Sequence, residues 1–353
     1  MPVEPIYNNQ EPFPVETPED VARLVDLLVP AADDDPLSRL LGDHFSLLAA
    51  THPEWITPYR ELVLTERLES FNGNFGDFRI LFGGASDGCV EHLLGQLRDG
   101  WKTWPGWGLA SIGTEAAMSA LADWVRAGGE RGDLEDLGVW IPPTGPAQYR
   151  FPLERKAVFL RKFDDPAELS TVDNPVGLPL AEVLRDPEKS PVTWHYVSLR
   201  VDQLPGMATW PVPRVHLVGP RANWGWELTA AFDEDGRYQG EIARIEGRPD
   251  AEEEGYLIGD EQYGGNHGAV ALRPYDGDLV YCNGHIQLTP DVVGTAGGPP
   301  LGVGRTPHCP ACERLMFHVA SVEHHVRDYG DGWRGLFVCE DCRLVTCNAN
   351  GWN

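Results

Sequence analysis

The sequence predicts an α+β protein with a helical N-terminal region, an antiparallel β-rich central body and a C-terminal zinc ribbon. Three observations support this class: helix caps in the first third, alternating apolar residues after about residue 137, and two C-x-x-C pairs near the end. The predicted segments are 1–136, 137–300 and 301–353. A chain of 353 residues is long enough for about two domains with their own apolar cores.

The first third carries clear helix signals. Thr17-Pro18-Glu19-Asp20 predicts a helix start, with Thr17 as the N-cap and acidic residues near the positive end of the helix dipole. The residues after it place an apolar stripe on one face: Val21, Leu24, Leu27 and Leu28. A second helix is expected after Asp35-Pro36, and a third between Thr114 and Gly128.

Strand signals dominate the middle of the chain. Residues 224–232 alternate apolar and polar side chains, and Asp-Glu-Asp-Gly then turns the chain into a returning strand from Arg237. Downstream, residues 268–291 are interpreted as a meander of three strands, because Asp276-Gly277 and Asn283-Gly284 favour tight hairpins. We identify no internal repeat in the sequence.

Two cysteine pairs carry the strongest functional signal. They follow the pattern C-x2-C-x26-C-x2-C: Cys309, Cys312, Cys339 and Cys342. Four thiolates at this spacing form a tetrahedral zinc site, and the 26-residue insert can hold a β-hairpin. Because a closed four-sulfur shell leaves no position for water, the zinc is expected to be structural, with iron as an alternative metal. Cys347 is interpreted as a spare thiol. The nearby His308, His318, His324 and His325 could replace a cysteine ligand, but they are interpreted as exposed side chains.

Charge limits the class of partner. The formal net charge is −26, and residues 305–353 carry five Arg, no Lys and six acidic residues. Such a surface repels phosphate backbones, so nucleic acid is excluded and a protein or peptide partner, possibly a basic one, is expected.

No apolar run approaches the roughly 18–20 residues of a membrane helix. With no secretory leader in the sequence and cysteines spaced for a metal, we expect a cytoplasmic protein that does not bind membranes.

A family resemblance accompanies the cysteine spacing. It rests on Cys309-Pro310-x-Cys312, Met316-Phe317-x-Val319-Ala320, Gly330-Asp331-Gly332 and Phe337-x-Cys339, with a fainter match at 197–206. In these motifs the chain resembles YwqG-like bacterial proteins, a largely uncharacterised family. The resemblance implies a β-rich body with a cysteine ribbon near its end. Glu313 and Arg343 depart from the pattern, because Gly commonly follows the second cysteine of a knuckle.

An enzymatic alternative starts from Gly84-Ala85-Ser86-Asp87-Gly88, which fits the G-x-S-x-G motif of a nucleophile elbow if a strand precedes it and a helix follows. The competing interpretation is that Ser86 or Asp87 caps a helix beginning near Gly88.

A second enzymatic candidate is a polar loop that contains Asp260, Glu261 and His267, with His285 across the predicted meander. Carboxylates and imidazoles that converge on a loop can bind a catalytic metal or transfer protons, although an exposed polar loop has the same composition.

Three tryptophans, Trp101, Trp104 and Trp107, lie in a segment broken by Pro and Gly. Exposed indoles of this kind stack on peptides, whereas buried ones cover a core. The sequence therefore favours an acidic protein- or peptide-binding factor with a structural zinc. The alternative is a modifying enzyme, a hydrolase or transferase, that uses the His/Asp/Glu loops of the β-body.

Overall fold

The structure of the chain is a computed structural model. It describes residues 14–31, 36–67, 81–99, 104–153, 155–162, 173–185, 193–220, 226–245, 268–274, 280–282, 285–287, 292–300, 306–323 and 333–350.

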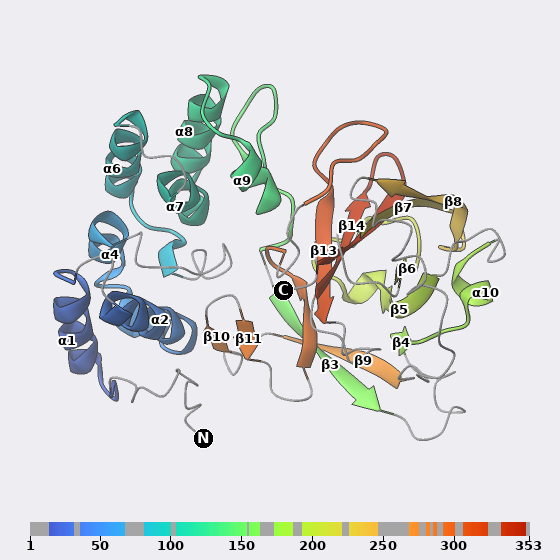
Figure 1. Ribbon diagram of the computed structural model, residues 1–353, viewed down its shortest axis with the longest axis horizontal. Helices are drawn as coiled ribbons and strands as arrows, with labels where there is room; N and C mark the ends of the chain where they lie inside the picture. Colours follow the sequence, from blue (N-terminus) through green and yellow to red (C-terminus); the bar gives the residue numbers. More distant parts are fainter. Residues whose placement is uncertain are drawn as a thin grey trace. The chain divides into compact units, whose positions relative to one another are not determined.

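The chain folds into two compact units (Figure 1). The first comprises Met1–Tyr149 and Asp276–Gln287, and the second comprises Arg150–Tyr275 and Leu288–Asn353. Helices dominate the first unit and an antiparallel sheet dominates the second, so the predicted α+β class is confirmed. The division into three segments stays a prediction.

The first unit is built from helices in sequence order. They are α1 (Pro18–Leu28), α2 (Pro36–Thr51), α3 (Pro53–Ile56), α4 (Arg60–Glu66), α6 (Asp87–Arg98), α7 (Trp104–Ile112), α8 (Glu115–Arg126) and α9 (Gly132–Asp136). A small antiparallel pair follows, β1 (Val139–Trp140) with β2 (Gln148–Tyr149).

Local capping chemistry determines where α1 and α8 begin. The Thr17 side chain accepts from the Asp20 backbone and the Asp20 carboxylate accepts from the Thr17 backbone, which forms a capping box. At α8 the Thr114 hydroxyl accepts from the Ala117 N–H at 3.2 Å, and Gly128 follows the helix with φ +106°. Both predicted starts are therefore confirmed.

One residue of the predicted α1 stripe is wrong. Leu27 is 44% exposed, and Val25 is buried in its place beside Val21, Leu24 and Leu28. Residues 21, 24, 25 and 28 follow the helical spacing of a single face more closely than 27 does. None of the helices in the described part of the chain has both the length and the apolar character needed to cross a bilayer.

The predicted meander is only partly correct. β10 (Val280–Cys282) and β11 (His285–Gln287) form the expected hairpin, with Cys282 opposite His285. However, β9 (Gly268–Pro274) pairs with strands of the second unit, and β10 packs against α2 in the first (Figure 1). Asp276 and Gly277 lie outside the described residues, but the strands on either side of them, β9 and β10, do not pair with each other.

The second unit contains an eleven-stranded sheet in the order β6-β5-β4-β9-β3-β12-β13-β14-β15-β7-β8. Its remaining elements are β3 (Arg155–Lys162), β4 (Pro175–Val176), α10 (Leu180–Val183), β5 (Thr193–Arg200), η4 (Val201–Gln203), β6 (Arg214–Pro220), β7 (Trp226–Phe232), β8 (Tyr238–Ile245), β12 (Val292–Gly297), β13 (Phe317–Glu323), β14 (Trp333–Cys339) and β15 (Leu344–Asn350). The predicted hairpin of β7 and β8 is confirmed. The hairpin predicted inside the cysteine insert is also present, as β13 and β14.

The cysteine segment is continuous with the rest of the sheet. β12 pairs with both β3 and β13, and β15 pairs with both β14 and β7. The strands that flank the cysteines therefore lie in the middle of the sheet, where their core-facing side chains join the same hydrophobic cluster as those of β5 and β6.

The sheet contains an internal repeat that the sequence analysis missed. The order β6-β5-β4-β9 on one side corresponds to β14-β13-β12-β3 on the other. Val176 pairs with Val197 in the first copy, and Ala296 pairs with Ala320 in the second. The middle strand of each copy also has a β-bulge one residue before this pair, at Tyr196 in β5 and at Val319 in β13. In both strands the bulged residue directly follows a histidine.

The two copies of the repeat also share weak sequence similarity when they are aligned by their strand registers. Trp-His-Tyr-Val-Ser-Leu at 194–199 aligns with Phe-His-Val-Ala-Ser-Val at 317–322. Gly177 follows Val176 and Gly297 follows Ala296, with φ +74° and +75°. A left-handed backbone favours glycine at both positions.

Candidate metal centre

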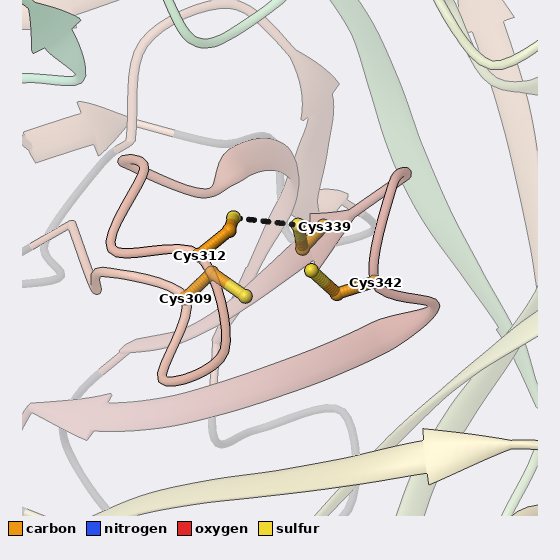
Figure 2. Close-up of side chains that lie close together, drawn as sticks. All are labelled: Cys309, Cys312, Cys339 and Cys342. Carbon is orange, nitrogen blue, oxygen red and sulfur yellow. Dashed lines mark hydrogen bonds between the residues drawn. The ribbon is translucent and has the colours of Figure 1, made fainter.

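The four cysteines come from two turns that meet beside the β13–β14 hairpin. Cys309 and Cys312 lie in the connection before β13, whereas Cys339 ends β14 and Cys342 lies in the turn to β15. All four sulfur atoms lie within 4.8 Å of one another (Figure 2). The chain thus brings together two sulfur pairs that are 26 residues apart in sequence.

The sulfur geometry fits a tetrahedral metal ion. The Sγ atoms of Cys312 and Cys339 are 3.7 Å apart. A Zn–S bond of about 2.3 Å in a regular tetrahedron places its sulfurs about 3.8 Å apart. Among the residues that the structure describes, this is the one cluster of three or more His, Cys, Asp or Glu side chains suited to a metal. The four cysteines are therefore positioned to bind a metal ion.

Backbone hydrogen bonds shape each knuckle. In the first, the Cys309 N–H donates to the Arg314 carbonyl and the Glu313 N–H donates to the Cys309 carbonyl, both at 2.8 Å. Backbone N–H groups also donate to sulfur, from Arg314 to Cys312 and from Cys342 to Cys339. Such bonds stabilise thiolates before any metal arrives.

The pKa shifts show that the cluster does not readily hold four negative charges. Burial raises the pKa of Cys339 well above its ordinary value. A hydrogen bond with the Cys312 thiol and then burial raise the pKa of Cys342 to about 11. At Cys312 burial also opposes ionisation, but hydrogen bonds from the Arg314 backbone and the neighbouring thiols lower its pKa overall. Crowded thiols favour one thiolate, and a divalent cation would relieve this crowding.

Two arginines place positive charge near the sulfurs. Arg150 is half-buried, its Nε donates to the Leu315 carbonyl at 2.9 Å, and its charge favours ionised Cys339 and Cys312. Arg314 of the first knuckle pairs with Asp341 of the second at 2.6 Å. That ion pair is partly exposed, so it contributes about 0–1 kcal/mol to stability, but it links the two knuckles.

The other thiol and imidazoles of this region have separate environments. Cys347 lies in β15, and burial raises its pKa to about 12. His308 Nδ1 lies 2.9 Å from the Glu313 carbonyl. His318 was expected to be exposed, but it is fully buried between the Gly298 carbonyl and the Ser321 hydroxyl. His324 and His325 lie outside the described residues.

Ser86 lies at the N-cap of α6 and is exposed. Its N–H donates to the Glu61 carboxylate at 3.0 Å. The nucleophile-elbow motif requires a strand before the serine, but Leu81 and Phe82 are helical. The described backbone around Ser86 therefore matches the capping position and lacks the strand context of an elbow.

The remaining candidates have little structural description. Asp260, Glu261 and His267 lie outside the described residues. The backbone of His285 lies in β11, which belongs to the first unit.

Of the three tryptophans, Trp101 lies outside the described residues and Trp104 begins α7, a helix where an irregular segment was expected. Trp107, in the same helix, is half-buried. The peptide-binding role of these indoles stays a prediction.

Sequence reasoning missed a buried polar chain in the first copy of the repeat. The Leu178 N–H donates to His195 Nδ1 at 2.9 Å, so His195 Nε2 donates to Ser198 Oγ at 2.8 Å. Ser198 Oγ is in turn hydrogen-bonded with His216 Nδ1 at 2.7 Å. All three side chains are buried, so this hydrogen-bonded series lies in the core of the second unit and not in a cleft.

Comparison with known proteins gives no family. No family model matches the chain, and no curated protein or solved structure matches it either. The resemblance to YwqG-like proteins therefore finds no support in these comparisons.

Proposed function

We propose that this protein is a non-catalytic binding protein in which Cys309, Cys312, Cys339 and Cys342 hold one structural Zn²⁺. The observation that carries the proposal is the approach of all four sulfurs to within 4.8 Å. Four thiolates fill a tetrahedral shell, so no position is left for water or substrate on the metal. Iron fits the same donor set and is the alternative metal.

The proposed role of the zinc is to tie the two ends of the β13–β14 hairpin together. One knuckle precedes β13 and the other follows β14, so the metal closes the hairpin at the end opposite its turn. Closing this long loop removes conformational freedom from the unfolded chain and stabilises the centre of the sheet.

Cobalt substitution tests the coordination directly. Co²⁺ added to the metal-free protein should give the thiolate charge-transfer and visible bands of a tetrahedral four-sulfur site. The Cys342→Ser variant should lose intensity in these bands, whereas Cys347→Ala should retain them because Cys347 lies outside the cluster. Octahedral spectra in the unsubstituted protein would contradict a closed shell.

The proposed partner is a protein or peptide, and a basic one is favoured by the net charge of −26. An arginine-rich peptide should bind more tightly than a glutamate-rich peptide of the same length, and added salt should weaken its binding. Equal binding of both peptides would contradict this assignment. Nucleic acid and membrane lipids are not proposed as partners.

The proposed location is the cytoplasm. The six cysteines whose side chains are described are free thiols, as a reducing compartment favours. The enzymatic alternative stays a prediction, because its main candidates, Asp260, Glu261 and His267, lie outside the described residues.

A further inference from the structure

A pocket of about 550 Å³ lies at the end of the β5–β6 hairpin. Its charged lining comes from Arg200, Asp202 and Arg214, and its apolar lining includes Trp210, Pro211 and Pro213. Trp210 is held in place against Phe232, with ring centroids 5.4 Å apart. The pocket thus has one polar side and one fixed apolar wall.

Two arginines stand directly opposite each other at this pocket. Arg200 ends β5 and pairs in register with Arg214 at the start of β6. Like charges at directly opposed positions destabilise a sheet. Neutralising partners or an anionic ligand would therefore stabilise the arrangement.

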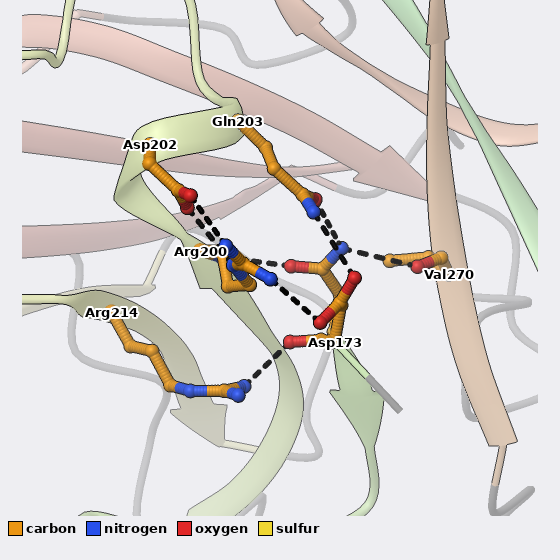
Figure 3. A network of polar contacts seen from close by, with 7 residues as sticks. Asp173, Arg200, Asp202, Gln203, Arg214 and Val270 are labelled. Atoms are coloured by element: carbon orange, nitrogen blue, oxygen red, sulfur yellow. Dashed lines mark hydrogen bonds and ion pairs between the residues drawn. The ribbon is translucent and has the colours of Figure 1, made fainter. Parts of the chain in front are cut away.

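Acidic partners neutralise Arg200. Its Nε donates to Asp202 at 2.9 Å, its Nη2 donates to the other oxygen of Asp202, and its Nη1 donates to Asp173 at 2.8 Å (Figure 3). Hydrogen bonds from Arg200 lower the pKa of both carboxyls, which keeps them charged at neutral pH. Two carboxylates thus surround one guanidinium.

Arg214 is bonded differently. Its Nη1 donates to the Asp173 backbone carbonyl at 2.6 Å, which fixes the guanidinium beside the pocket (Figure 3). Within the described ranges of the chain, no carboxylate forms an ion pair with Arg214, although its charge also helps to lower the pKa of Asp173 and Asp202. A guanidinium presents five donors, and this carbonyl uses one of them.

We propose that this pocket binds a small organic carboxylate, with its charged group on Arg214 and its apolar part against Trp210. A planar guanidinium fork matches the two oxygens of a carboxylate. Asp202 lines the same pocket, so a dianionic phosphate would meet more repulsion than a monoanionic carboxylate. The pocket lies outside the four-cysteine cluster, and none of its lining residues is one of those cysteines.

The pocket loop also touches the second cysteine knuckle. Thr209 Oγ1 donates to Glu340 Oε1 at 3.0 Å, one residue after Cys339. Loss of metal could therefore displace the loop. For this reason the metal content of each sample must be measured before binding is tested.

The test is a titration of the metal-loaded full chain with benzoate and with its neutral isostere, benzamide. Binding is followed by nuclear magnetic resonance at the indole N–H of Trp210. Benzoate is expected to bind with a Kd on the order of 1 mM, as about nine non-hydrogen atoms allow, and benzamide at least about tenfold more weakly.

Variants separate a carboxylate site from general charge effects. Arg214→Gln should abolish the preference for benzoate, and Arg214→Lys should restore part of it by returning the charge without the fork. Arg23→Gln is the matched control, because Arg23 is 70% exposed in the first unit. Equal binding of the two probes, benzoate binding that survives Arg214→Gln, or no benzoate shift in fully metallated protein would overturn the proposal.

Discussion

Glu313 and Arg343 adopt the same left-handed backbone conformation, each directly after the second cysteine of its knuckle. Their φ angles are +59° and +54°, and they are the two non-glycine residues with positive φ in the described part of the chain. Glycine commonly fills this position, because a Cβ there crowds the following carbonyl. Glu313 and Arg343 thus depart from the knuckle pattern in their side chains, but both keep the left-handed backbone that favours glycine at this position.

This conformation predicts an unusual response to mutation at Arg343. Arg343→Val should destabilise the protein by about 1–2 kcal/mol, because a β-branched residue is strained at positive φ. Arg343→Gly should change the free energy of unfolding by less than about 1 kcal/mol, since relief of strain offsets the greater freedom of the unfolded chain. Urea unfolding measures both variants.

The matched control is Ala311, which is exposed in the first knuckle and does not have a positive φ. There glycine should destabilise at least as much as valine. If glycine also destabilised the protein at least as much as valine at position 343, left-handed strain would not explain the effect of mutation at Arg343.

Arg150 should strengthen metal binding, because its half-buried positive charge favours ionised cysteines. Arg150→Met is expected to weaken zinc affinity by about tenfold or more, which corresponds to about 1.4 kcal/mol. Arg150→Lys should lose less, since it keeps the charge. Competition with a chromophoric chelator measures these affinities. Arg343→Met, at an exposed position beside Cys342, is the control, and an equal loss there would argue against a special role for Arg150.

Zinc affinity should rise with pH. The raised pKa values of Cys339 and Cys342 keep both thiols protonated near neutral pH in the metal-free protein, so zinc must displace their protons. At least about two protons should be released per zinc, with affinity rising about tenfold per pH unit for each. Calorimetry in buffers of different ionisation enthalpy counts these protons. Affinity that is constant between about pH 6 and about pH 8 would contradict the thiol assignment.

His216 should make the protein less stable in mild acid. Burial lowers the pKa of His216 from 6.5 to about 4. The unfolded chain therefore takes up this proton first, and stability falls as the pH drops from about 6.5 to about 4, by roughly 3 kcal/mol in total. Urea unfolding at a series of pH values should show a shallower pH dependence for His216→Asn. The exposed His92→Asn variant should keep the full dependence.

Features set by nearby residues could be predicted from the sequence. The caps at Thr17 and Thr114 depend on contacts within three residues, and the two cysteine pairs depend on fixed short spacings. The β7–β8 hairpin could also be predicted, because its turn residues and its alternating apolar side chains lie in one continuous stretch of sequence. In each case the deciding interaction lies inside the segment that carries the signal.

Features set by distant partners could not be predicted. Asp276-Gly277 is a sound turn signal, but β9 pairs with β3 and β4 instead of β10. The two copies of the repeat share the strand registers at Val197 and Ala320 but few identical residues, so the sequence does not reveal them. The pocket depends on Arg200 and Arg214 being opposed across a hairpin with a long loop, which sequence spacing does not reveal.

The repeat also bears on what the metal does. The first copy forms the same three-stranded register without any of the four cysteines. Metal removal is therefore expected to lower the free energy of unfolding while the sheet persists. In circular dichroism, the chelated protein should keep its β signal at low temperature and unfold at a lower Tm than the metal-bound protein.

The most direct test of the account is elemental analysis of the purified protein beside its Cys339→Ser and Cys347→Ala variants. The account predicts one zinc per chain in the unsubstituted protein and in Cys347→Ala, and strongly reduced zinc in Cys339→Ser. Metal retained at full occupancy in Cys339→Ser, or no zinc or iron in the unsubstituted protein, would contradict a four-cysteine metal centre.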